Sequence, residues 1–138
     1  MRGHALALAV VLAGGSVSIV LAGAHHLITE VYDVGRTETI EGRVDRFVYQ
    51  DPHSFVHLQV PGRRGRPLTW AVELEGAAKL RQLGVNSRTL RPGDRLTVCG
   101  NPGRDAGQYR LLMLALERPR DGLSVRRTTE EWQLDCAR

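Results

Sequence analysis

The segment LTWAVELEGAAKLRQLG, residues 68–84, changes from one periodicity to another. From Leu68 to Leu74 apolar and polar residues alternate, which is typical of a β-strand with one buried face. From Gly76 to Gly84 the apolar residues recur at three-residue spacing, which predicts a short helix that ends at a glycine. A helix therefore follows this strand almost directly.

Two predicted strands precede this segment and two follow it. A phase shift between Val44 and Phe47 predicts a β-bulge in the first strand. Five strands with a helix between the third and the fourth give the element order of the OB fold. We therefore predict an all-β protein with one short helix, a five-stranded OB-like β-barrel preceded by an N-terminal hydrophobic helix. The predicted strands are Thr37–Tyr49, Phe55–Val60, Leu68–Leu74, Arg95–Gly100 and Gln108–Glu117.

The N-terminus carries an export signal. Arg2 precedes an uncharged run from Ala5 to Ala24, and the run closes on small residues. This pattern is typical of a cleaved signal peptide, although an uncharged run of about 20 residues is also long enough to cross a bilayer. We expect a signal peptide or membrane anchor at 1–24, a lead-in at 25–36, the barrel at 37–118 and a C-terminal tail at 119–138.

The composition limits the classes of ligand that we expect this chain to bind. The chain has 138 residues, a formal net charge of +4 and few aromatic residues, with its arginines scattered among acids. A length of this order allows one globular domain. Mixed charge with few stacking groups favours a solvated surface and disfavours a nucleic-acid ligand.

Two cysteines, Cys99 and Cys136, suit an oxidising compartment. We predict a disulfide between them, with two buried free thiols as the alternative. A capping-box pattern at 128–131 predicts a short tail helix that carries Trp132 and Cys136 on one face.

Several short motifs occur together in a recognisable order. They are Ala24-His25-His26, Asp51-Pro52-His53, Trp70-Ala71-Val72-Glu73, Leu80–Gly84 and Leu90–Gly100, the last beginning Leu-Arg-Pro-Gly-Asp. In this the chain resembles, from His25 to Gly122, a family of small secreted bacterial domains of unknown function, which usually has Asn-Pro-His in place of Asp-Pro-His. The resemblance implies an exported small domain and no particular reaction.

The histidines suggest a metal site. Four residues of regular strand between His53 and His57 would separate them by about 13 Å, so they share an ion only if the corner folds back. Glu73 is expected on the same outward face as His57, where the two could pair across the ladder. Cleavage after Ala24 would give His25 a free amine beside its imidazole, and copper(II) prefers such tetragonal nitrogen ligands.

We therefore hypothesise a copper or zinc site built from His25 and either His53 or His57, supported by Glu73 or Asp51. The alternative is purely structural: His53 caps the hairpin by hydrogen bonding and His25 is a linker residue. Neither the metal-site hypothesis nor the structural alternative identifies a catalytic residue.

The outer face of the second and third strands commonly binds ligands in OB barrels. We expect an exported, non-enzymatic binding or interaction module of the bacterial cell envelope, anchored as an accessory subunit if residues 5–24 are retained. Its expected location is periplasmic or secreted, and its expected partner is an envelope protein or a membrane surface. The alternative is a periplasmic copper- or zinc-binding protein, and an enzyme that uses the metal ranks third. The predicted binding surface consists of Phe55, His57, Glu73, Arg63, Arg64 and Arg66.

Overall fold

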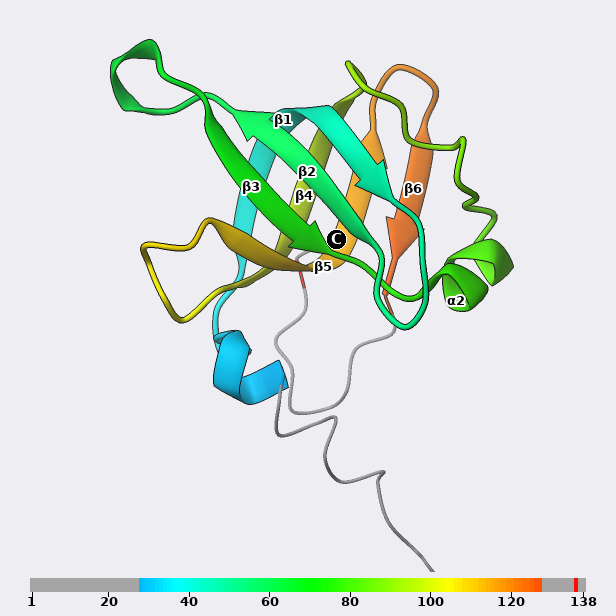
Figure 1. The fold of residues 1–138 in the computed structure, drawn as a ribbon, viewed down its shortest axis with the longest axis horizontal. Coiled ribbons are helices and arrows are strands. Elements are labelled where there is room, and N and C mark those ends of the chain that lie inside the picture. The colour runs from blue at the N-terminus through cyan, green and yellow to red at the C-terminus, as the bar shows by residue number, and fades with distance from the viewer. Residues whose placement is uncertain (1–27, 128–135, 137–138) are drawn as a thin grey trace, which may run out of the picture.

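The computed structural model describes residues 28–127 and residue 136, which form a β-barrel with a helix at its side (Figure 1). The predicted N-terminal hydrophobic helix lies outside these residues, and so does most of the predicted tail helix. None of the helices within the described ranges is long and apolar enough to span a membrane. The elements are β1 (Glu38–Val48), β2 (Phe55–Val60), the 3₁₀ turn η1 (Arg63–Gly65), β3 (Leu68–Glu73), α2 (Ala77–Gln82), β4 (Arg95–Pro102), β5 (Arg110–Arg118) and β6 (Leu123–Arg126).

The strands close into a five-stranded barrel. The order along the sheet is β3-β2-β1-β4-β5, and a parallel pairing of β3 with β5 joins the two ends. The helix α2 lies between β3 and β4 in the chain, so the predicted element order is confirmed.

A sixth strand, β6, was not predicted. It pairs antiparallel with the C-terminal half of β5, whereas β3 pairs with its first three residues. Because β4 occupies one edge of β5, β3 and β6 share the other edge. Residues 119–138, expected as a tail, therefore contribute a strand to the sheet. The segment Leu123–Arg126 has only four residues, which is too short to indicate a strand in sequence.

The long strand β1 serves both halves of the barrel. Its first half pairs with β4 and its second half pairs with β2. The register with β2 shifts between Val44 and Arg46, which confirms the predicted bulge. At Gly42 a Cβ atom would lie 2.9 Å from the carbonyl oxygen of Gln59, so only glycine allows β1 and β2 to cross this closely.

Apolar side chains fill the barrel at alternate strand positions, as the periodicity predicts. α2 covers one end of this core through Leu80, which is fully buried. The hydroxyl of Tyr49 donates a hydrogen bond to the carbonyl of Ala77 and holds the helix against the end of β1. The buried core includes Ile40, Val44, Val56, Leu58, Val72, Leu74, Leu96, Val98, Leu111, Met113 and Leu116.

The predicted disulfide is present. Cys136 is bonded to Cys99 on β4, and it packs with Leu114 and Ala115 of β5 outside the barrel. The bond therefore ties the end of the chain to the outer surface of the β4–β5 pair. Trp132 lies outside the described residues.

Candidate functional site

A buried carboxylate, Glu73, gathers three polar side chains at the end of β3. The hydroxyl of Tyr32 donates a hydrogen bond of 2.6 Å to its Oε2 atom. The Nδ1 atom of His53 lies 3.1 Å from Oε1, and an Nη2 atom of Arg110 lies 3.5 Å from Oε2. We call these four residues the Glu73 cluster. It joins the lead-in, the β1–β2 corner, β3 and β5.

His53 is the solvent-facing member of the Glu73 cluster, with a side chain 51% exposed, compared with 12% for Glu73. With Nδ1 directed at the carboxylate, Nε2 is the ring nitrogen that is available to bind an ion. Carboxylates orient metal-binding and proton-transferring histidines in this way.

Tyr32 and Arg110 seal the buried side of the cluster. Arg110 donates a hydrogen bond to the Tyr32 hydroxyl oxygen, which lies 3.3 Å from an Nη2 atom of the arginine. The guanidinium carbon of Arg110 lies 5.5 Å from the centre of the tyrosine ring. Burial raises the pKa of Tyr32 above its usual value, and the adjacent Glu73 carboxylate raises that pKa further. The Tyr32 hydroxyl therefore keeps its proton and, as a hydrogen-bond donor, holds the carboxylate in place. Neither residue was predicted, because nothing in the lead-in or in β5 distinguishes them from core or surface residues.

His57 does not join the cluster. In the β2–β3 register it faces Ala71, and Glu73 faces Phe55, so the predicted His57–Glu73 pair is wrong. Its Nε2 atom lies 3.3 Å from an Nη2 atom of Arg46 instead. Burial and the charge of Arg46 lower the pKa of His57, which keeps its ring neutral near pH 7.

The neighbours of His53 in the corner have structural roles. The Oδ1 atom of Asp51 accepts a hydrogen bond from the backbone N–H of Ala78 and so caps the first turn of α2. Buried Ser54 bonds through its hydroxyl to both the N–H and the carbonyl of Gln50. The hairpin is therefore clamped by Ser54 rather than by His53, and the Ser54 hydroxyl is committed to the backbone.

Of the predicted metal ligands within the described residues, the structure brings together one imidazole and one carboxylate. Glu73 supports His53, whereas His57 and Asp51 are engaged elsewhere. Within residues 28–127 and 136, no group of three or more histidine, cysteine, aspartate or glutamate side chains is close enough to hold an ion. His25 lies outside the described residues.

The predicted binding surface is divided along β3. Glu73 ends that strand, and the loop at 61–67 precedes its first residue, so about 16 Å of strand separates them. On β2, Phe55 lies opposite Glu73 and His57 lies opposite Ala71, and both are partly exposed. We call residues 61–67 the arginine loop. Its arginines Arg63, Arg64 and Arg66 are exposed and do not approach the Glu73 cluster.

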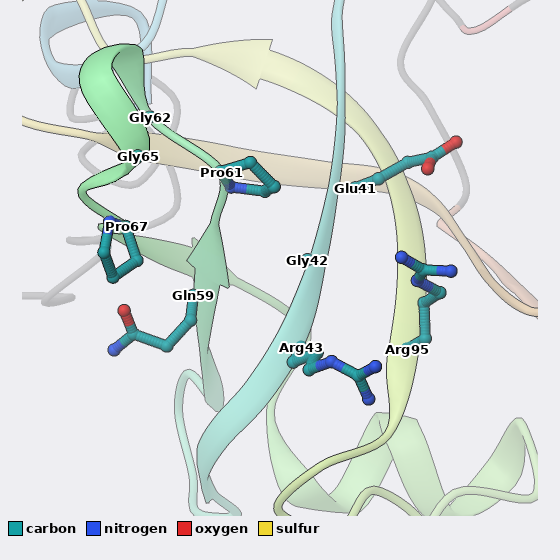
Figure 2. Close-up of a pocket in the computed structure, with 9 residues that line it drawn as sticks. All are labelled: Glu41, Gly42, Arg43, Gln59, Pro61, Gly62, Gly65, Pro67 and Arg95. Atoms are coloured by element: carbon teal, nitrogen blue, oxygen red, sulfur yellow. The ribbon is translucent and has the colours of Figure 1, made fainter.

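A cavity of about 380 Å³ lies between the arginine loop and β1. Figure 2 shows prolines 61 and 67 on one side of β1 and the side chains of Arg43 and Arg95 on the other. Gly42 lies between these two walls and contributes no side chain that would divide them. Sequence reasoning missed Arg43 and Arg95, because their position depends on the strand register, in which Arg43 lies between Gln59 on β2 and Arg95 on β4. The remaining lining residues are Glu41, Gln59, Gly62 and Gly65.

Four arginines near this cavity have no acidic partner among residues 28–127 and 136. Within the described part of the chain, Arg63, Arg64, Arg66 and Arg95 make no ion pair, in contrast to Arg110, Arg118, Arg120 and Arg127. Arg43 reaches the carbonyl of Gly93 at 3.3 Å. Glu41 is the one acid in the lining, so the surface around the cavity is positive.

Arg64 is also held in an unusual backbone conformation, with φ 61° and ψ 29°. It is the only non-glycine residue with positive φ among those described. Such a conformation costs about 1 kcal/mol or more for a residue with a Cβ atom, and it is often found at functional positions.

Comparison with solved structures adds one distant likeness. The mitochondrial single-stranded DNA-binding protein Rim1 of S. cerevisiae has a TM-score of 0.45 and 14% sequence identity. The alignment covers 59% of this chain and 91% of that chain. A likeness this weak carries no argument about the ligand. No curated protein matches the chain. A family model matches residues 12–111, and the chain therefore belongs to DUF6152, a family of unknown function.

Proposed function

We propose that this chain is an exported, non-enzymatic binding module of the bacterial cell envelope, and that the arginine loop with the adjacent cavity is its binding surface. One observation carries the proposal: Arg63, Arg64, Arg66 and Arg95 are exposed beside one cavity without a described acidic partner. Unpaired guanidinium groups beside a hollow favour an external anionic partner.

The state of the other polar groups supports binding over catalysis. Glu73 is engaged by three side chains, and the Ser54 hydroxyl is bonded to the backbone of Gln50. These groups stabilise the barrel and its corner. If residues 5–24 are retained as an anchor, the module acts as an accessory subunit at the membrane.

Site-directed photo-crosslinking in the producing bacterium tests this proposal. A photoreactive residue in place of Arg64 should give a discrete adduct, and one in place of Arg81 should not. Arg81 is a matched control because it is exposed on α2, far from the arginine loop (Figure 1). The same adduct pattern from both positions, or none from Arg64, would contradict the proposal.

A second candidate function is the binding of copper or zinc. The contact between His53 Nδ1 and Glu73 favours it, because it orients an exposed imidazole. His25, with a free amine after cleavage, would supply the remaining nitrogen ligands. Copper titration of the mature protein and of His53→Ala tests this, with His57→Ala as the matched control. Equal copper affinity in all three proteins would remove the candidate. Intact-mass measurement adds a second test, since a mass that begins at Met1 excludes the N-terminal amine of His25.

A further inference from the structure

We propose that the cavity beside the arginine loop binds an acidic segment of a partner protein, with carboxylates at Arg64 and Arg95 and apolar atoms against Pro61 and Pro67. This inference rests on the proposed function and names the class of partner. It is carried by the charge around the cavity, the shape of the cavity and its position on the barrel.

Charge complementarity gives the sign of the partner. Guanidinium groups pair with carboxylates through two parallel hydrogen bonds. Arg64 and Arg95 are both exposed, and neither has an acidic partner in the described ranges, so neither pairing would break an internal ion pair. Lying on opposite sides of β1, the arginine loop and Arg95 can hold two carboxylates of one segment (Figure 2).

The shape of the cavity favours a polypeptide. Its volume of about 380 Å³ is at the small end of the range for ligand sites and suits a few side chains. Pro61 and Pro67 give one wall an apolar surface that cannot donate backbone hydrogen bonds. A segment that alternates acidic and apolar residues matches both walls at once.

The arginine loop lies far from the point at which the described chain begins. The helical turn at 28–31 is at the opposite end of the barrel from the arginine loop (Figure 1). The described part of the lead-in therefore leaves the arginine loop open to a protein partner.

The test uses a synthetic peptide of alternating glutamate and proline residues and a second peptide with glutamine in place of glutamate. Fluorescence anisotropy with the purified full chain measures both affinities. We expect the glutamate peptide to bind, with an affinity that falls as salt is added, and the glutamine peptide to bind at least about tenfold more weakly. Equal binding of the two peptides, or no binding of the glutamate peptide, would overturn the inference.

Paired variants locate the site. Arg64→Gln combined with Arg95→Gln should weaken binding of the glutamate peptide by about three- to tenfold, since two exposed ion pairs of modest strength are lost. Arg81→Gln combined with Arg88→Gln removes the same charge from exposed positions near α2 and should leave affinity unchanged. Equal losses in the two pairs would mean non-specific charge attraction and overturn the inference. Because all four side chains are exposed, the fold should survive, and circular dichroism checks this.

Vesicles separate this inference from the proposed function. If vesicles containing phosphatidylglycerol bind through Arg64 and Arg95 while the glutamate peptide does not, the partner class is wrong and a binding module remains. If crosslinking from Arg64 also fails, the proposed function fails with it. Binding of the peptide alone supports both.

Discussion

The Nδ1 atom of His53 lies 3.1 Å from the Oε1 atom of Glu73, which joins the β1–β2 corner to the end of β3. The carboxylate is buried and the imidazole is half exposed. Because Tyr32 and Arg110 also contact this carboxylate, Glu73 fixes the lead-in, the corner and β5 relative to one another.

Replacement of Glu73 should destabilise the protein. Glu73→Gln removes the charge that balances Arg110 and places an amide donor among groups that already donate. Because Arg110 is one third exposed, this pair is partly screened by solvent, and its loss should cost roughly 1 to 3 kcal/mol. Urea denaturation measures the loss, with Glu117→Gln, an exposed strand position, as a control expected within about 0.5 kcal/mol of the parent. Equal stability of Glu73→Gln and Glu117→Gln would contradict the structural role of the cluster.

The Tyr32 hydroxyl should make stability depend on alkaline pH. Burial and the Glu73 carboxylate raise the pKa of Tyr32, so the folded state favours the protonated phenol. This contribution is complete below the unfolded pKa of about 10 and is lost as pH rises above that value. The free energy of unfolding should fall above about pH 10 in the parent and less steeply in Tyr32→Phe. At neutral pH, Tyr32→Phe should cost about 1 to 2 kcal/mol, because the Oε2 atom of Glu73 loses its closest donor and, among the described residues, keeps only Arg110, at 3.5 Å.

The barrel could be predicted from sequence because its signals are local and repeated. Alternation along β2 and β3, the shift of period at Gly76 and the turn around Pro92 each mark a boundary. The bulge in β1 follows from the same pattern, since an extra residue must change which side chains face inward. The strand β6 has four residues and no comparable signal, and it forms because β5 has a free edge there.

The candidate sites could be predicted only in part. The sequence indicated His53, Glu73 and the arginine loop, but it paired Glu73 with His57, because a plain count of alternate positions does not fix the cross-strand register. Tyr32 and Arg110 come from segments 41 residues before Glu73 and 37 after it, and only the closed barrel brings them together. Arg95 lines the cavity because the β1–β4 register places it opposite Arg43.

A second buried charge network should govern stability in acid. Arg118 contacts Asp94 at 2.6 Å and also bonds Asp121 and the carbonyl of Thr89. Burial acts to raise the pKa of Asp94, but hydrogen bonds from Arg91 and Arg118 outweigh it and lower that pKa overall. The stabilisation is therefore present above the unfolded pKa of about 4 and is lost as pH falls below it.

Asp94→Asn should flatten this acid dependence. Arg118→Ala should cost roughly 1.5 to 3 kcal/mol at pH 7, because the buried Asp94 carboxylate loses its shortest ion pair and, among the described residues, keeps only Arg120, at 3.0 Å, and the backbone N–H of Arg91. Denaturation curves measure both effects. They should be recorded from about pH 7 down to about pH 3, a range that includes the unfolded aspartate pKa of about 4. Parallel curves for the parent and Asp94→Asn would show that this carboxylate does not couple folding to pH.

Reduction of the disulfide should destabilise the protein without unfolding the barrel. The bond closes a sequence separation of 37 residues, which corresponds to about 3 to 4 kcal/mol in the chain-entropy model. Because Cys136 covers Leu114 and Ala115, hydrogen exchange should accelerate first on the outer side of β5. Cys136→Ser should reproduce the effect of reductant, and reductant should then change its stability no further. Unchanged stability after complete reduction would contradict this prediction.

Arg64 should lower the stability of the protein while its side chain contributes to binding. Because Arg64 has a φ of 61°, Arg64→Gly relieves a conformation that is unfavourable for a residue with a Cβ atom. Glycine also gains entropy in the unfolded chain, so the net increase in the free energy of unfolding should be only about 0.5 to 1 kcal/mol. Arg63→Gly is the matched control: it removes the same charge from a residue without positive φ and should not stabilise the protein. If Arg64→Gly is more stable than the parent yet binds the glutamate peptide more weakly, then the Arg64 side chain contributes to binding although its backbone conformation is unfavourable. If both glycine variants change stability equally, the conformation of Arg64 is not a source of strain.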